Sequence, residues 1–191
     1  MSKDIIVKKG LDINLVGDAS KTLDISKDSK LFSVYPDDFH GVYPRLTVKV
    51  DDKVKVGDVL FFDKNNEEVK FVSPISGKIS EIQRGERRKV VSIDIQSDKN
   101  NDYKDLGKLD AKSDKSKIIE YLLNSGLWPF IKQRPYDIIA DHKIQPKAIF
   151  ISGFSSAPLS ADLDFISQDY QDKIQNAINV LSKLTDGEVH M

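Results

Sequence analysis

The chain has 191 residues, with 29 basic and 30 acidic side chains and no cysteine. This charge balance excludes a global field that attracts nucleic acid or an anionic membrane. The missing cysteines exclude disulfides, thiolate-bound zinc, iron–sulfur clusters held by this chain and a thiol nucleophile. No segment approaches the roughly 20 apolar residues of a membrane span, so we expect no transmembrane segment of its own.

Short segments of alternating apolar and polar residues fill the first half of the chain and predict β-strands. Strands are expected near residues 5–7, 11–15 and 31–35, with a polar loop over residues 18–30. The loop after residue 35 carries Phe39, His40 and Tyr43. These side chains either form a binding surface or close the end of a small barrel.

A paired motif over residues 48–82 carries the clearest fold signal. Two strands around Asp-Asp and Gly-Asp turns come first, and the corner at Ser73-Pro74 then separates strands near residues 69–72 and 78–82. Pro74 has a fixed φ, and we expect Gly77 to supply a positive φ. The pair resembles the half-repeat of lipoyl and biotinyl carrier domains, which implies a barrel-sandwich hybrid.

Those carrier domains hold their modified lysine at a hairpin tip before the Ser-Pro corner. By the resemblance, the tip falls here on Asn66 and Glu67, and Lys64 lies outside it. We therefore expect the scaffold without the covalent carrier chemistry, and a carboxyl or acyl carrier is the weakest of the functional alternatives.

Two further strands, residues 79–83 and 90–95, are joined by a basic hairpin tip. Its cations are Arg84, Arg87, Arg88 and Lys89. They could hold a phosphate or an RNA backbone, but no aromatic platform flanks them. The alternatives are a solvated turn and a rim that meets an acidic partner subunit, and we expect the hairpin to face a partner.

A change of composition suggests two domains. Residues 1–97 form the expected barrel-sandwich domain, residues 98–117 are a polar linker or surface-hugging segment, and residues 118–191 belong to an α/β domain. Ser113 or Asp114 can cap a helix that begins the second domain, and Gly126 can end it.

Directly after this helix comes a segment rich in aromatic residues and proline. It contains Leu127, Trp128, Phe130, Arg134, Pro135 and Tyr136. Such a composition is typical either of a ligand site or of a loop that packs on the core, and the sequence leaves both interpretations open.

The last third of the chain predicts the start of a Rossmann-like α/β unit. An apolar run over residues 147–153 suits a parallel strand buried on both faces, a helix covers residues 174–184, and residues 188–191 begin another strand. We expect this domain to be truncated. No dinucleotide fingerprint, phosphate loop, nucleophile elbow or metal-ligand spacing occurs, so we predict no catalytic, cofactor-binding or metal-ligating residue.

Several stretches together resemble one family, the A subunit of the bacterial sodium-translocating NADH:quinone oxidoreductase. The most specific are G-L-W at residues 126–128 followed by R-P at 134–135, and A-P-L-S-A-D at 157–162. The other matching stretches are residues 8–13, 56–61, 69–78, 82–85, 148–151 and 181–190. The Asp51-Asp52 turn departs from the usual Gly-Asp.

The resemblance implies a peripheral subunit on the cytoplasmic side of an inner-membrane complex that oxidises NADH, reduces quinone and transports Na⁺. It implies no cofactor on this chain, with NADH, FAD or FMN, and Fe-S centres in partner subunits, and quinone as the associated ligand. Residues 127–136 are then the expected quinone or partner contact. The alternative is an interaction module of a related electron-transport subunit, such as the C subunit of the ferredoxin:NAD⁺ complex.

Overall fold

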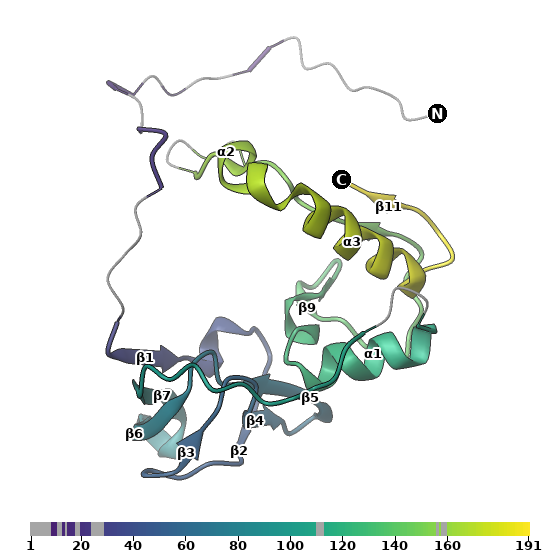
Figure 1. Ribbon diagram of the computed structural model, residues 1–191. Coiled ribbons are helices and arrows are strands. Elements are labelled where there is room, and N and C mark those ends of the chain that lie inside the picture. The colour runs from purple at the N-terminus through teal and green to yellow at the C-terminus, as the bar shows by residue number, and fades with distance from the viewer. Residues whose placement is uncertain are drawn as a thin grey trace.

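The computed structural model describes residues 9–10, 13, 15–17, 20–23, 29–109, 113–155, 157 and 160–191. The strand expected near residues 5–7 and most of the loop at 18–30 lie outside these residues. Of the strand expected at 11–15, Ile13 and Leu15 are described, and neither is in a strand. Figure 1 shows the strands of the first half gathered in one lobe, with the helices of the second half beside it.

Two antiparallel sheets form the first lobe. One has the strand order β1-β7-β6-β3 and the other the order β2-β4-β5. The strands of this lobe are β1 (Leu31–Val34), β2 (Pro44–Leu46), β3 (Lys53–Val54), β4 (Val59–Asp63), β5 (Asn66–Val72), β6 (Gly77–Arg84) and β7 (Val90–Ser97). Two short 3-10 helices, η1 (Pro36–Asp38) and η2 (Glu86–Arg88), lie in its connections.

Alternation along the strands accounts for part of the core of this lobe, because every second side chain of a regular strand points to the same face. It is interrupted in β4, where the consecutive residues Leu60 and Phe61 are both buried at a register shift. Leu60, Phe61, Ile79, Ile93 and Ile95 have no exposed surface. Phe61 stacks on Phe71 with ring centroids 4.4 Å apart, and Phe39 packs edge-on against Phe71 at 4.7 Å. Of the two interpretations of the loop after residue 35, Phe39 thus follows the barrel-closing one, whereas Tyr43 is exposed.

The predicted corner at Ser73-Pro74 is confirmed, since β5 ends at Val72 and β6 begins at Gly77. The expectation that Gly77 supplies a positive φ is wrong, because it is absent from the glycines with positive φ. Glycine is needed there for another reason. A Cβ at Gly77 would overlap the backbone carbonyl of Gln96 on the neighbouring strand β7.

The connecting segment from residue 98 follows the surface of the first lobe. Val56 N–H donates to the Asp102 carbonyl at 2.8 Å, and Lys104 N–H donates to the Val56 carbonyl at 2.8 Å. Ser76 Oγ–H donates to Asp98 Oδ1 at 2.6 Å and lowers the pKa of that carboxyl below its ordinary 3.8. These contacts hold the segment on the barrel beside the Ser-Pro corner.

Helix α1 (Lys115–Asn124) begins and ends at the predicted residues. The Asp114 carboxylate caps it by accepting from Lys117 N–H at 2.9 Å, and Gly126 follows it with a φ of 72°. The elements that follow are η3 (Trp128–Phe130), β8 (Lys132–Gln133), β9 (Ile138–Ile139), β10 (Ile149–Phe150), α2 (Leu163–Ser167), η4 (Gln168–Tyr170), α3 (Gln171–Leu181), η5 (Ser182–Leu184) and β11 (Val189–His190).

Strands β10 and β11 pair in parallel, as expected for an α/β unit. The prediction that the first of them is buried on both faces is wrong: Phe150 is 77% exposed. Among the described residues β10 pairs with one strand, β11, and Ile149 is half-buried whereas Phe150 is exposed. Half-buried Ile174, Ile178 and Leu181 mark the inward face of α3.

Candidate functional site

The aromatic segment at residues 127–136 begins directly after α1 and continues into a small hairpin. Helix η3 comes first, and β8 and β9 then pair antiparallel, with Lys132 opposite Ile139 and Gln133 opposite Ile138. Residues 134–137 form the tip of this hairpin, with a cis bond between Arg134 and Pro135. In Figure 1 the hairpin, labelled at β9, lies between the barrel and α3.

Trp128 anchors the segment to the core rather than presenting its ring at the surface. It is 5% exposed, and its indole Nε1–H donates to the Ala140 carbonyl at 2.8 Å. The edge of its ring faces His142, with ring centroids 6.1 Å apart. The expectation that Trp128 stacks on a ligand is therefore not met in this arrangement, whereas the interpretation as a packed loop holds for this residue.

Leu127, Phe130 and Tyr136 are the exposed apolar members of the segment, at 50%, 69% and 73%. Phe130 lies edge-on to Phe39, with centroids 5.8 Å apart, and Lys132 Nζ lies 5.7 Å from the centroid of the same Phe39 ring. The segment therefore joins the barrel-closing loop in one surface. We call Leu127, Phe130, Arg134, Pro135 and Tyr136 the aromatic surface.

Arg134 supplies the positive charge of the aromatic surface. Its guanidinium Nη1 lies 4.0 Å from Asp137 Oδ1, and both side chains are well exposed. An exposed pair at this distance contributes little to stability. The guanidinium therefore keeps donors that can reach a carbonyl or carboxylate oxygen of a ligand or partner.

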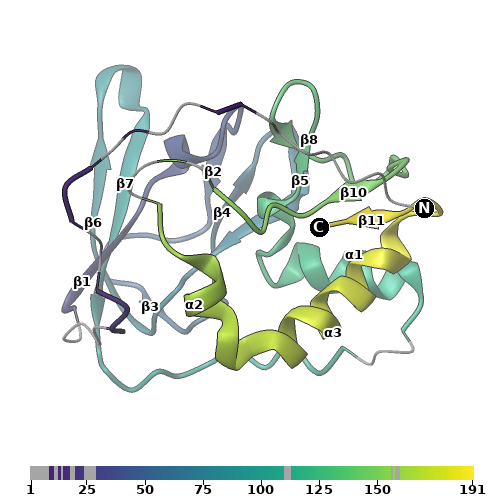
Figure 2. The same ribbon diagram turned by 90° about the horizontal axis from the view of Figure 1, so that it is seen from above.

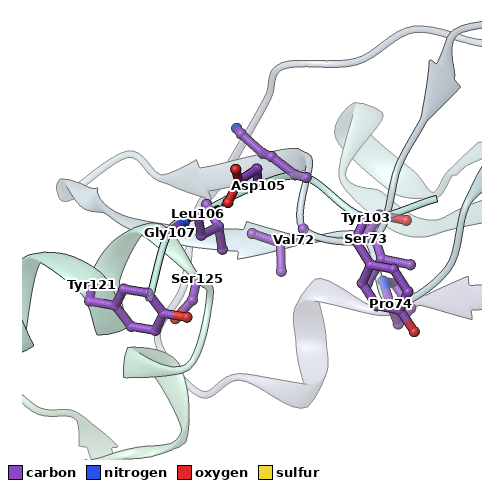
Figure 3. A pocket seen from close by; sticks show the side chains of 12 residues that line it. Val72, Ser73, Pro74, Tyr103, Asp105, Leu106, Gly107, Tyr121 and Ser125 are labelled. Carbon is purple, nitrogen blue, oxygen red and sulfur yellow. Dashed lines mark hydrogen bonds between the residues drawn. The ribbon is translucent and has the colours of Figure 1, made fainter. Parts of the chain in front are cut away.

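An open groove of about 590 Å³ lies between the Ser-Pro corner, the connecting segment and α1. Figure 3 shows Tyr121 and Ser125 at one end of it and Pro74 and Tyr103 at the other, with Val72 between them. None of the residues of the aromatic surface lines this groove. The sequence showed no sign of it, because the groove depends on how the connecting segment lies against the barrel.

A second groove, about 570 Å³, lies between β5 and α1, and His142 is part of its wall. The His142 side chain is 6% exposed, and its Nε2 lies 2.9 Å from Glu68 Oε2. Although these two atoms are close, Nε2 is buried and makes no hydrogen bond of acceptable geometry. Asn66 Nδ2 lies 3.4 Å from the other ring nitrogen, so His142 ties the second half of the chain to β5.

The basic hairpin tip lies where the sequence placed it, between β6 and β7. Lys89 Nζ contacts Asp37 Oδ2 at 2.6 Å, and Arg84 Nη1 donates to the Arg88 carbonyl at 3.1 Å. Among the described residues, no carboxylate lies within ion-pair distance of Arg87 or Arg88. The four cations thus differ: Arg84 and Lys89 have partners in the chain, whereas Arg87 and Arg88 are exposed.

The position of Lys64 differs from the prediction. Asp63 pairs with Asn66 across β4 and β5, so the two-residue tip of this hairpin consists of Lys64 and Asn65. Counting from the Ser-Pro corner placed the tip at Asn66 and Glu67, and that placement is wrong. The reason is that β5 is seven residues long and pairs out to its first residue, which shortens the loop.

The A-P-L-S-A-D stretch leads into α2, although Pro158 and Leu159 lie outside the described residues. The Asp162 carboxylate caps α2 by accepting from Phe165 N–H at 3.0 Å. It also contacts Lys21 Nζ at 2.9 Å, and this hydrogen bond lowers the pKa of Asp162 and raises that of Lys21. These roles are structural: a cap and a surface ion pair.

Neither metal chemistry nor a membrane span is evident in the part of the chain that the structure describes. No group of three or more His, Asp or Glu side chains there is arranged to hold a metal ion. The longest described helix, α3, has 11 residues, and no described helix combines the length and apolar character needed to cross a bilayer.

Comparison of the sequence with known protein families identifies the family of this chain. The model of the NqrA N-terminal barrel-sandwich hybrid domain matches residues 5–98, and that of the NqrA second alpha/beta domain matches residues 113–191. Both descriptions confirm the predicted fold class.

Relatives from Marinomonas sp. (strain MWYL1), Saccharophagus degradans and Vibrio alginolyticus are 33%, 34% and 32% identical over 188, 188 and 191 residues. Each is named as the A subunit of the Na(+)-translocating NADH-quinone reductase. The alignments cover 97–98% of this chain but only 42–43% of the relatives, so the chain spans less than half of their length.

Proposed function

The chain belongs to the NqrA family, and from this premise we propose that it works as a peripheral, non-catalytic part of a Na⁺-translocating NADH-quinone reductase. Its partners are then the other subunits of that membrane complex, which carry the NADH, flavin and Fe-S chemistry, and it lies on the cytoplasmic side. The family membership replaces the alternative of a ferredoxin:NAD⁺ subunit.

Within that role, the aromatic surface is the proposed quinone contact. The observation that supports it is the exposure of Phe130 and Tyr136 beside a guanidinium with free donors, at Arg134. An aromatic ring offers a face or an edge to the quinone ring, and the guanidinium donates to a quinone carbonyl oxygen.

The aromatic surface lines neither of the two grooves, and this shapes the proposal. A binding site for a small ligand usually buries most of the ligand's surface, and an open protein surface cannot do this by itself. The quinone is therefore bound between this surface and a partner subunit. In this proposal the buried Trp128 fixes the position of residues 127–136 but does not contact the quinone.

Photo-crosslinking tests this proposal. The assembled reductase is labelled with a photoreactive quinone analogue, and the labelled peptides of this chain are mapped by mass spectrometry. We expect label at residues 127–136 that unlabelled quinone competes away. Label confined to other segments, or label that quinone does not displace, would remove the claim.

A pair of variants sharpens the same test. Phe130→Ala removes an aromatic contact, and we expect the analogue to bind about 2- to 10-fold more weakly, the range for a single aromatic contact. Phe150→Ala removes a similarly exposed ring outside the aromatic surface and serves as the matched control. An equal loss in both variants would show that the effect is not local.

A second candidate function, the covalent carrier, is favoured by one observation. Lys64 stands at an exposed two-residue hairpin tip, as a carrier lysine requires. Intact-mass measurement of the chain from a host with active ligases tests it, with Lys64→Arg as the control. An unmodified mass for the unaltered chain eliminates this candidate.

A further inference from the structure

The tip of the β6–β7 hairpin has a backbone geometry that its sequence does not explain. Lys89 N–H donates to the Glu86 carbonyl at 3.1 Å, and Gly85 N–H donates to the Lys89 carbonyl at 2.9 Å. The two central residues of this turn, Arg87 and Arg88, have φ values of 53° and 60°. Positive φ at both central positions is the mark of a type I′ turn.

Type I′ turns strongly favour Asn-Gly at these two positions, because glycine and asparagine tolerate the left-handed region best. Arginine tolerates it poorly, since its Cβ crowds the backbone there. Two consecutive arginines in this conformation therefore strain the turn. Turn formation alone does not account for them, and strain of this kind gathers at functional sites.

Contacts within the chain hold the base of the turn and leave its two central side chains exposed. Arg84 donates to the Arg88 carbonyl and Lys89 contacts Asp37, so the base of the turn is held on both sides. Arg87 and Arg88 themselves are exposed and, among the described residues, have no carboxylate within ion-pair distance. The hairpin of β6 and β7 stands at one side of the molecule in Figure 2, where a partner can reach it.

We propose that the Arg87–Arg88 turn is a docking site for an acidic protein segment. Guanidinium groups pair with carboxylates through two parallel hydrogen bonds, a geometry that lysine does not match. The site is separate from the aromatic surface and does not depend on quinone binding there.

Two other anionic partners fit the turn less well. A membrane-binding turn usually carries aromatic or large apolar anchors, but the apolar neighbour here is Val91, which is only 38% exposed. A single-stranded nucleic acid needs aromatic side chains on which bases stack, and residues 84–91 contain none. Carboxylates need only the guanidinium groups that are present.

The experiment measures binding of the 191-residue chain to a fluorescein-labelled peptide of ten glutamates by fluorescence anisotropy. We expect binding at low salt that weakens as salt screens the charges. The decisive variant is the double substitution R87N/R88G, which installs the preferred Asn-Gly turn and removes both charges. It should raise Tm, because the strain is relieved, and weaken peptide binding about tenfold.

A charge-matched control separates a site from general electrostatics. The double substitution K108Q/K117Q removes two exposed cations outside the turn and should leave peptide affinity unchanged within about twofold. An R87E/R88E variant should lose the glutamate peptide and bind a peptide of ten lysines instead.

Four results would overturn the proposal. They are unchanged peptide binding by R87N/R88G, an equal loss in K108Q/K117Q, a fall of Tm in R87N/R88G, and a preference of the unaltered chain for another anion. The last is measured with phosphatidylglycerol vesicles and with oligouridylate: tighter binding that depends on Arg87 and Arg88 would assign the turn to lipid or to nucleic acid.

Discussion

The barrel lobe at residues 31–97 and the region from residue 113 onward differ in how many of their apolar side chains are buried. Of the buried apolar residues among those described, nine lie in the lobe and four in the second region. In the second region Phe130, Tyr136, Phe150 and Phe154 are all more than two-thirds exposed. The lobe therefore holds most of the buried apolar core, and the second region has four largely exposed aromatic side chains.

The largest expected effect tests this division directly. Phe61→Ala removes a fully buried ring that stacks on Phe71, and we expect a loss of about 3–5 kcal/mol in the free energy of unfolding. Phe150→Ala removes an exposed ring and should change it by about 0.5 kcal/mol or less. Urea unfolding followed by circular dichroism measures both. Similar losses in the two variants would break the comparison.

The next prediction concerns the contact between the second region and the barrel, where Gly126 lies against Val72 of β5. A Cβ at Gly126, after α1, would lie 2.7 Å from Val72 Cγ2 on β5, and its φ is 72°. Gly107 has the same φ but nothing within 4 Å of an added Cβ. We expect Gly126→Ala to cost about 2–4 kcal/mol and Gly107→Ala only about 1 kcal/mol.

The difference between these two glycine variants in thermal or urea unfolding isolates the contact between α1 and the barrel. If both substitutions cost the same, the backbone conformation is the whole effect, and the two regions do not pack against each other at Val72.

Trp128 is one of the four buried apolar residues of the second region. Trp128→Phe keeps an aromatic ring but removes the donor to the Ala140 carbonyl, so we expect a loss of about 1–3 kcal/mol. Phe130→Leu, two residues further, should change stability by less than about 0.5 kcal/mol. A neutral Trp128→Phe would mean that the tryptophan is not the anchor of the aromatic surface.

The smallest effect is a pH dependence where the connecting segment meets the barrel. Because the hydrogen bond from Ser76 lowers the pKa of Asp98, the stabilising contribution of this carboxylate is present above about pH 4 and lost as the pH falls further. Ser76→Ala should reduce the acid sensitivity of stability between about pH 4 and pH 2. Thermal unfolding at a series of pH values measures it, and identical profiles would contradict the assignment.

Local patterns in the sequence determined much of the fold. Alternation predicted the strands from β4 to β7, Pro74 predicted the corner, and Asp114 with Gly126 predicted the limits of α1. These features depend on backbone preferences and on the side-chain period within a few neighbouring residues. Some of these stretches, such as residues 56–61 and 69–78, also carried the family resemblance that the comparisons bear out.

The tertiary structure alone decided which side chains are available for function. Burial of Trp128 depends on Ala140 and His142, the place of Lys64 depends on the register of β4 and β5, and the left-handed turn at Arg87 depends on hairpin closure. None of these contacts follows from local preference. Which segment covers a side chain is settled only when residues distant in sequence pack together.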